Sequence, residues 1–288
     1  PASWEWLNPA GGVELTSATQ ALLLGVFLYW GWDTAMSVNE ETHAPAKTPG
    51  RSILIATAAL VGCYAMVAVA LQAFAGTAAL GGEDAGEDVF AVVAEPLLGS
   101  AGVTVLSIMV IVSAAAALAT TILPSSRTVF AMASYRAAPR LFGRTNSHGT
   151  PSVATTGIGV AGCAFYVGMA AISDNMLADS ILSISMAICV YYAITGLTSA
   201  VWFARSARGA SALLSSVLLP GIGGLLMLLV LIRSAWDMAD PEYGDTSLLG
   251  VGGALLIGAG SLLAGLVFMA IWARAEPSFF RTHDRVDA

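Results

Sequence analysis

The residues best suited to bind a small molecule lie in one stretch near the start of the chain, Gly25-Val-Phe-Leu-Tyr-Trp-Gly-Trp-Asp33. It lies within an apolar run, residues 17–39, that is long enough to cross a membrane. Gly25 and Gly31 each weaken a helix by about 1 kcal/mol relative to alanine. We therefore predict an interrupted helix near Gly31, whose released backbone amides and carbonyls can bind the ammonium or carboxylate of a small zwitterion.

Aromatic side chains and one acid surround the predicted interruption. Phe27, Tyr29 and Trp30 can wall a pocket, and their ring faces also suit a cation. A carboxylate such as Asp33 is costly within a membrane, so residues of this kind usually face a cavity or a partner. The alternative is a continuous helix with lipid-facing aromatic side chains, in which Asp33 is hydrated near the cytoplasm.

The surrounding chain has the composition of a membrane protein. It has 288 residues, of which 57% are hydrophobic and only 11% charged, fewer charges than a soluble domain carries. Without water, the backbone must close its own hydrogen bonds as helix, and the apolar runs do not alternate as barrel strands do. We predict an all-α polytopic membrane protein with one domain, seven transmembrane helices and a short external helix at residues 88–99. The seven predicted crossings are residues 17–39, 52–76, 103–135, 152–172, 176–204, 212–235 and 248–273.

The charged residues divide between the two sides of the membrane. Ten of the twelve Lys and Arg residues lie in alternate gaps between the apolar runs, and thirteen of the nineteen acids lie in the other gaps. Basic loops are retained in the cytoplasm, so we expect the N-terminus outside and the C-terminus inside. The acids of the outer gaps, which include Asp179 and Asp237, are interpreted as solvated loop residues.

Two sequence patches carry a resemblance to a known family. The first is Tyr29-Trp-Gly-Trp-Asp33, with Asn39-Glu-Glu-Thr42 and Lys47-Thr-Pro-Gly-Arg-Ser52. The second is Ser125-Ser-Arg-Thr-Val-Phe-Ala-Met-Ala133, with Pro139-Arg-Leu-Phe-Gly143 and Gly149-Thr-Pro151. They resemble amino acid permeases of the amino acid–polyamine–organocation superfamily, which has the leucine-transporter fold. The first patch is similar to the sixth helix and the loop after it, and the second to the end of the eighth helix and the start of the ninth.

The resemblance extends over essentially the whole chain. It implies that the seven crossings are helices six to twelve, the second inverted repeat plus two extra helices. Five helices would then be missing before Pro1, among them the first helix, which supplies the other half of the substrate site. The expected partners are this missing half, the lipid bilayer and an amino acid or amine, but no nucleic acid.

The resemblance also implies site residues. The broken sixth helix would contact substrate at Phe27, Leu28, Trp30 and Gly31, with Phe27 as a gate, and Asp33 matches a position where relatives carry an acid. Thr120 and Thr121 would line the pathway on the eighth helix, and Tyr191 or Tyr192 would approach from the tenth.

Secondary transport of amino acids or related amines is the function that these features favour. Ser113 lies where sodium-coupled relatives place hydroxyl ligands, but one serine beside Ala114 is a poor cation site, which favours proton coupling or exchange. No metal or cofactor is expected. A sensor built on a transporter scaffold, which binds ligand without moving it, is the alternative.

An enzyme is disfavoured because intramembrane hydrolysis needs metal ligands or a nucleophile–base pair. The histidines, His43, His148 and His283, all lie in inner loops or the tail. Gly157-Ile-Gly-Val-Ala-Gly162 fits a dinucleotide-binding pattern but lies inside an apolar crossing, which favours tight helix packing.

Two further predictions concern single side chains. Arg127 lies near the inner end of the third crossing, where it either extends toward the cytoplasm or pairs with an acid such as Asp33 or Glu40. Cys63, Cys163 and Cys189 lie in apolar runs and are interpreted as buried packing residues without disulfides.

Overall fold

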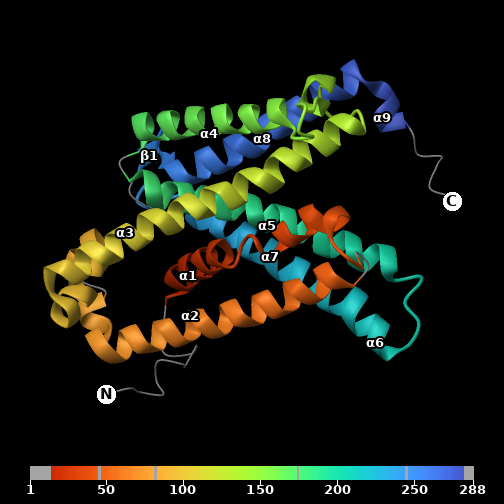
Figure 1. Cartoon of the computed structure of the whole chain (residues 1–288). Coiled ribbons are helices and arrows are strands. Elements are labelled where there is room, and N and C mark those ends of the chain that lie inside the picture. Colours follow the sequence, from red (N-terminus) through yellow and green to blue (C-terminus); the bar gives the residue numbers. More distant parts are fainter. Residues whose placement is uncertain (1–13, 45–46, 81–82, 174, 244–245, 282–288) are drawn as a thin grey trace. The chain divides into compact units, whose positions relative to one another are not determined.

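The computed structural model describes residues 14–44, 47–80, 83–173, 175–243 and 246–281 (Figure 1). The chain divides into two compact units, and each is described by itself. The first unit comprises residues 1–11, 31–134 and 139–159, and the second comprises residues 12–30, 135–138 and 160–288. The chain thus passes from one unit to the other between Trp30 and Gly31.

Six helices among the described residues are long and apolar enough to cross a membrane. They correspond to the second to seventh predicted crossings, so the predicted all-α polytopic membrane fold is confirmed. The first predicted crossing does not form a single helix of that length. The six helices are Thr48–Gly76, Val93–Ser134, Ser152–Ile172, Met176–Phe203, Ala210–Asp237 and Gly253–Ala275.

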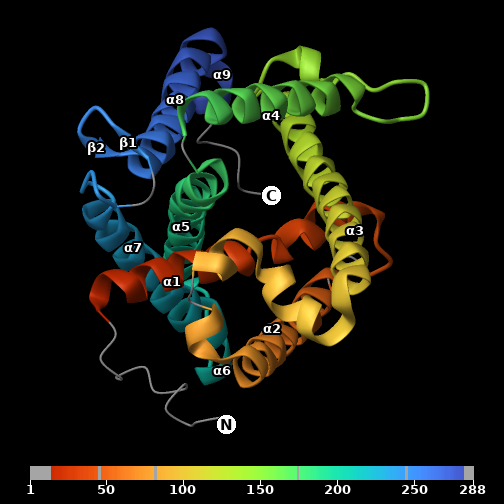
Figure 2. The same cartoon turned by 90° about the vertical axis from the view of Figure 1, so that its left-hand side faces the viewer.

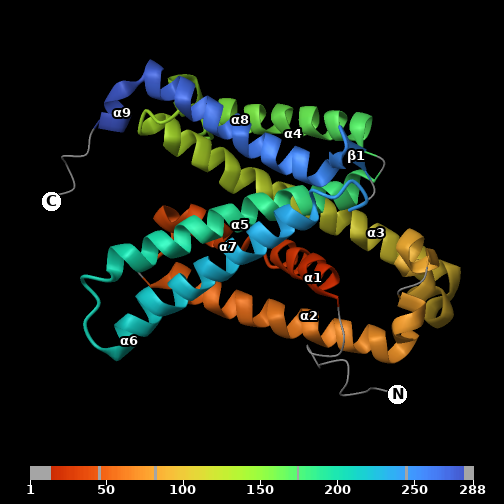
Figure 3. The ribbon, with the colours of Figure 1, turned by 180° about the vertical axis from the view of Figure 1, so that it is seen from behind.

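The second unit is built around α5 (Met176–Phe203) and α7 (Leu219–Asp237), which run side by side (Figures 1 and 3). Two glycines allow their backbones to approach. A Cβ atom added to Gly224 would lie 2.9 Å from the Leu197 nitrogen, and one added to Gly196 would lie 2.6 Å from the Pro220 oxygen. Small residues at a helix crossing permit this close packing within membranes.

Three further elements of the second unit, α1, α8 and η4, pack against this pair. α1 (Leu15–Leu28) packs against both helices, and the polar side chain of Ser185 on α5 bonds the Leu23 carbonyl of α1 at 3.1 Å. Ser183 bonds the Ala254 carbonyl of α8 at 3.0 Å. The other elements are α6 (Ala210–Leu213), the π turn η4 (Leu214–Leu218), α8 (Gly253–Ala275) and α9 (Pro277–Arg281).

A short hairpin precedes α8 (Figure 2). Its strands are β1 (Ser247–Leu248) and β2 (Val251–Gly252), with Ser247 opposite Gly252. Leu249 and Gly250 both have positive φ, 57° and 78°, which suits the two-residue turns that fit twisted strands. The helix predicted at residues 248–273 therefore begins later, at Gly253.

The first unit contains the 3-10 segment η2 (Trp32–Glu41), α2 (Thr48–Leu80), α3 (Glu83–Ser134), η3 (Arg140–Gly143) and the start of α4 (Ser152–Ile172). The separately predicted external helix 88–99 and third crossing 103–135 are both part of α3. Gly99 within it has a φ of 66°, and Figure 1 shows the chain changing direction within α3. A left-handed glycine permits such a bend without steric cost.

Two acids that were interpreted as solvated are buried instead. The Asp179 side chain is 1% exposed, and its Oδ2 accepts a hydrogen bond of 2.6 Å from the Ser173 hydroxyl. Asp237 is 8% exposed and forms an ion pair with Arg233, with 2.6 Å between Asp237 Oδ1 and Arg233 Nη2. Buried carboxylates need such partners, so the solvated interpretation is wrong for both residues. Asp174 and Asp245 lie outside the described residues.

The predicted packing of the cysteines and of the glycine motif is confirmed only in part. Cys189 is buried in a cluster with Leu23, Met186 and Met238, but Cys63 and Cys163 are exposed on the surfaces of their helices. A Cβ atom on Gly157 would lie 3.0 Å from the Phe142 ring, so tight packing is confirmed there. The other two glycines of that motif have open space beside them.

Candidate substrate-binding site

The first span is interrupted where the sequence predicted. The last α-helical bond of α1 joins the Tyr29 nitrogen to the Gly25 oxygen at 3.0 Å. The Trp30 nitrogen then bonds the Phe27 oxygen at 3.1 Å, a tighter three-residue turn. Gly31 has a φ of 101°, and the following residues form the 3-10 segment η2. The interruption is confirmed, and the alternative of a continuous helix is wrong.

Peptide groups at the interruption are left without backbone partners. Within the described part of the chain, the Gly31 N–H and the carbonyls of Leu28 and Trp30 take part in no hydrogen bond. The Gly31 carbonyl accepts a bond of 3.1 Å from the Thr34 nitrogen. One donor and two acceptors therefore lie within four consecutive residues. Unsatisfied groups of this kind inside a membrane are tolerated where they line a cavity or bind a ligand.

The second unit holds the aromatic part of the predicted site. Phe27 and Tyr29 are half-buried, whereas Leu28 and Trp30 are exposed. On α5, the rings of Tyr191 and Tyr192 lie 5.1 Å apart. Tyr191 is exposed, whereas the Tyr192 hydroxyl is shielded from solvent.

Contacts join α1 to both central helices of the second unit. Arg233 near the end of α7 donates a hydrogen bond of 3.5 Å to the Thr16 hydroxyl near the start of α1. Ser185 of α5 bonds the Leu23 carbonyl of α1, and Trp30 and Tyr192 each follow this bonded pair by seven residues in the sequence.

The first unit holds the polar part of the predicted site. Asp33 lies half-buried in the first turn of η2, which packs against α2 and α3. Thr120 and Thr121 are exposed on α3, and their hydroxyls donate to the Ala117 carbonyl at 2.9 and 2.8 Å. Each hydroxyl keeps acceptor capacity after this bond, so both residues can still accept a hydrogen bond from a ligand.

Arg127 contacts the segment that follows the interruption. Its Nη1 donates to the Ser37 carbonyl of η2 at 3.3 Å, and the side chain is half-buried. The guanidinium thus turns toward the 3-10 segment that carries Asp33. The side chain of Glu40, its other predicted partner, lies outside the described residues. Sequence reasoning missed this backbone contact because a carbonyl leaves no signal in residue type.

Ser185 was also missed as a positioning residue. It is fully buried, and it ties α1 to α5 two turns before the interruption. The available signal was a pair of serines, Ser183 and Ser185, inside an otherwise apolar crossing. Such hydroxyls commonly bond across helices within membranes.

Comparison with protein families identifies the chain. The family model described as "Amino acid permease" matches residues 2–272. The chain belongs to the amino acid permease family. Comparison with curated proteins finds no match, and comparison with solved structures finds none either.

Membership in this family indicates what the permease does in general. Amino acid permeases move amino acids across membranes, which agrees with the six membrane-crossing helices and with a small-molecule substrate. The family points to a transporter rather than to an enzyme.

Proposed function

We propose that the permease is a secondary active transporter that binds an amino acid or related amine at the interruption between Leu28 and Gly31. The observation that carries this proposal is the set of unpaired peptide groups at these residues. A substrate ammonium would donate to the carbonyls of Leu28 and Trp30, and a substrate carboxylate would accept from the Gly31 N–H.

The side chains around the interruption have distinct proposed roles. Phe27, as a gate, and Tyr29 and Trp30 would cover the apolar part of the substrate, and Tyr192 would approach it from α5. Asp33, Thr120 and Thr121 would supply polar contacts in the first unit. This division uses aromatic faces for the cationic or apolar groups and hydroxyls for the polar ones.

We propose proton coupling or exchange as the energy source. The reason is chemical: Ser113 is one hydroxyl beside Ala114, and a sodium ion needs several oxygen ligands. On the resemblance to permeases, the seven predicted crossings would be helices six to twelve, with the N-terminal end outside and the C-terminal end cytoplasmic. A preceding part of the transporter would supply the first helix and the other half of the site.

The test is uptake of labelled amino acids by the complete transporter in liposomes. We expect Trp30→Ala and Asp33→Asn each to reduce uptake about tenfold, since losing one aromatic or charged contact costs on the order of 1 kcal/mol or more. Trp202→Ala is the matched control, because Trp202 is an exposed tryptophan near the end of α5 and is not among the residues proposed to bind substrate.

Two outcomes would contradict the proposal. Wild-type uptake in both variants, at equal expression, would place the substrate elsewhere. Saturable binding without accumulation inside the liposomes would instead identify a sensor on a transporter scaffold.

A further inference from the structure

Two buried acids of the second unit differ in their partners. Asp237 is paired with Arg233, with 2.6 Å between Asp237 Oδ1 and Arg233 Nη2. Asp179 is only 1% exposed, and within the described part of the chain it takes part in no ion pair. A buried carboxylate without a compensating charge is strongly destabilising, so a positive charge is expected beside Asp179.

The two oxygens of the Asp179 carboxylate have different surroundings. Oδ2 accepts a hydrogen bond of 2.6 Å from the Ser173 hydroxyl. Oδ1 is shielded from solvent and accepts no hydrogen bond from any described residue. A buried acceptor of this kind is rare in folded proteins, and its usual explanation is an ion or a water molecule. Because a carboxylate oxygen is an acceptor, the ligand that fits Oδ1 carries positive charge.

Hydroxyl groups from two other segments meet at this carboxylate. Ser173 directly follows α4, and Thr246, which is 2% exposed, directly precedes β1. The Thr246 hydroxyl donates to Ser173 Oγ at 3.4 Å, and Ser173 in turn donates to Asp179, so this chain of donors ends at the carboxylate. A hydroxyl oxygen has two lone pairs, so it can coordinate a cation while it donates its own proton. Three chain segments thus place oxygen atoms around one negative charge.

Contacts with the start of α8 hold this arrangement in place. The Gly253 nitrogen bonds the Thr246 carbonyl at 2.7 Å, and a Cβ atom added to Gly253 would lie 3.0 Å from the Thr246 side chain. Ser183, one turn beyond Asp179 on the same face of α5, is 4% exposed and bonds the Ala254 carbonyl at 3.0 Å. The ligand oxygens are therefore fixed before an ion binds, which reduces the entropy lost on binding.

We propose that Asp179, Ser173 and Thr246 bind one sodium ion. Hard cations prefer oxygen ligands, and one buried carboxylate balances one positive charge, whereas Ca²⁺ takes about six to eight oxygens. The lone hydroxyl of Ser113 lacks this combination of a carboxylate with hydroxyls. None of the three residues is proposed to bind substrate, so the proposal goes beyond the proposed function. The ion stabilises the junction of α5 with the turn after α4 and the hairpin.

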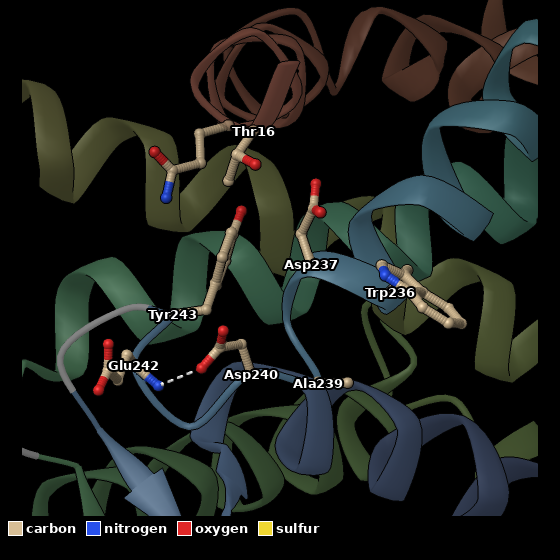
Figure 4. A pocket seen from close by; sticks show the side chains of 8 residues that line it. Thr16, Trp236, Asp237, Ala239, Asp240, Glu242 and Tyr243 are labelled. Carbon is tan, nitrogen blue, oxygen red and sulfur yellow. Dashed lines mark hydrogen bonds between the residues drawn. The ribbon is translucent and has the colours of Figure 1, made fainter. Parts of the chain in front are cut away.

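An exposed acid of the same unit provides the comparison. Figure 4 shows the Asp240 carboxylate beside the Glu242 backbone nitrogen, which donates to it at 2.9 Å, in the open pocket after α7. Asp240 is exposed, so water solvates its charge. Asp240→Asn therefore removes the same charge from the same unit and leaves the proposed sodium site unchanged.

The test is the thermal unfolding midpoint of the complete transporter in detergent, in NaCl or in choline chloride at equal concentration. We expect sodium to raise the midpoint by about 2–4 °C, because an ion that binds only the folded state stabilises it. Asp179→Asn should lose this rise, whereas Asp240→Asn should keep it. Thr246→Val should increase severalfold the sodium concentration that gives half of the rise, and Thr246→Ser, which keeps the hydroxyl, should not.

Each result decides the proposal. An equal sodium response in the wild type and in Asp179→Asn would overturn it, and so would a wild type that does not respond to sodium. Stabilisation by lower pH in choline chloride, without a response to sodium, would place a proton on the carboxylate and overturn it as well. If Asp179→Asn fails to fold, the two Thr246 variants give the decision. No transport substrate is present, so failure here leaves the interruption as the proposed substrate site.

Discussion

Single polar side chains determine how α1 is held in the second unit. Ser185 is fully enclosed, yet its hydroxyl reaches the Leu23 carbonyl at 3.1 Å and the Ile181 carbonyl of its own helix at 2.6 Å. The hydroxyl has one proton, so the two acceptors share it. If Ser185 is removed, the buried Leu23 carbonyl loses its hydrogen-bond donor from α5, which lowers stability more than the small volume of a serine side chain suggests.

We expect Ser185→Ala to lower the free energy of unfolding by about 1 kcal/mol, because a buried hydrogen-bonding group loses its partner. Thermal or denaturant unfolding of the protein in detergent measures the change. Ser261→Ala is the matched control, since Ser261 is exposed and its hydroxyl bonds only the Ile257 carbonyl of its own helix. Equal effects from both substitutions would show that the contact with α1 contributes nothing.

At this scale the sequence was informative where residue type alone decides the conformation. Gly31 was predicted correctly because glycine is the residue that tolerates a positive φ. The Arg233–Asp237 pair was also readable in principle, since the residues are four apart on one helix. The burial of Asp179 was not, because its partner Ser173 follows the end of the preceding helix α4, and the contact depends on the turn before α5.

The close approach of α5 and α7 depends on the absence of a Cβ atom at a single position. Gly224 faces α5, where an added Cβ would meet the Leu197 nitrogen at 2.9 Å and the Ala193 oxygen at 3.0 Å. Gly223, its neighbour on α7, has nothing within 4 Å. Substitutions at these two neighbouring glycines therefore test close helix packing and helix propensity separately, within one turn of α7.

We expect Gly224→Ala to destabilise the protein by about 1–3 kcal/mol, because the obstructing atoms belong to backbone and the helices must separate. Gly223→Ala should be neutral or stabilising by up to about 1 kcal/mol, through helix propensity alone. Unfolding midpoints in detergent compare the two. Equal midpoints for both variants would mean that α5 and α7 do not approach as closely as described.

The elements themselves were predicted better than their details. Six crossings followed from the length of apolar runs, because an uninterrupted apolar run in lipid has no alternative to helix. The hairpin at residues 247–252 was missed because its strands are two residues long and its turn contains an apolar Leu249. Short strands of this kind carry no periodicity to detect.

For the molecule as a whole, the distribution of charge predicts which loops face the cytoplasm. A membrane-impermeant maleimide should label Ala239→Cys in intact cells, since Ala239 is exposed in a loop expected outside. Ser147→Cys, exposed in the basic loop before α4, should react only after permeabilisation. Cys63 and Cys163 lie within membrane-crossing helices, which the bilayer shields from a water-soluble reagent. The reverse labelling pattern would invert the topology.

The conformation of Gly31 has a consequence for stereochemistry. An added Cβ would meet no atom within 4 Å, so space does not exclude a larger residue there. Only the φ of 101° does, and this angle disfavours L residues while it suits their mirror images. A D-alanine installed by chemical ligation would thus keep the bend and restrict the unfolded chain, whereas L-alanine would oppose it. Chirality, rather than size, reserves this position for glycine.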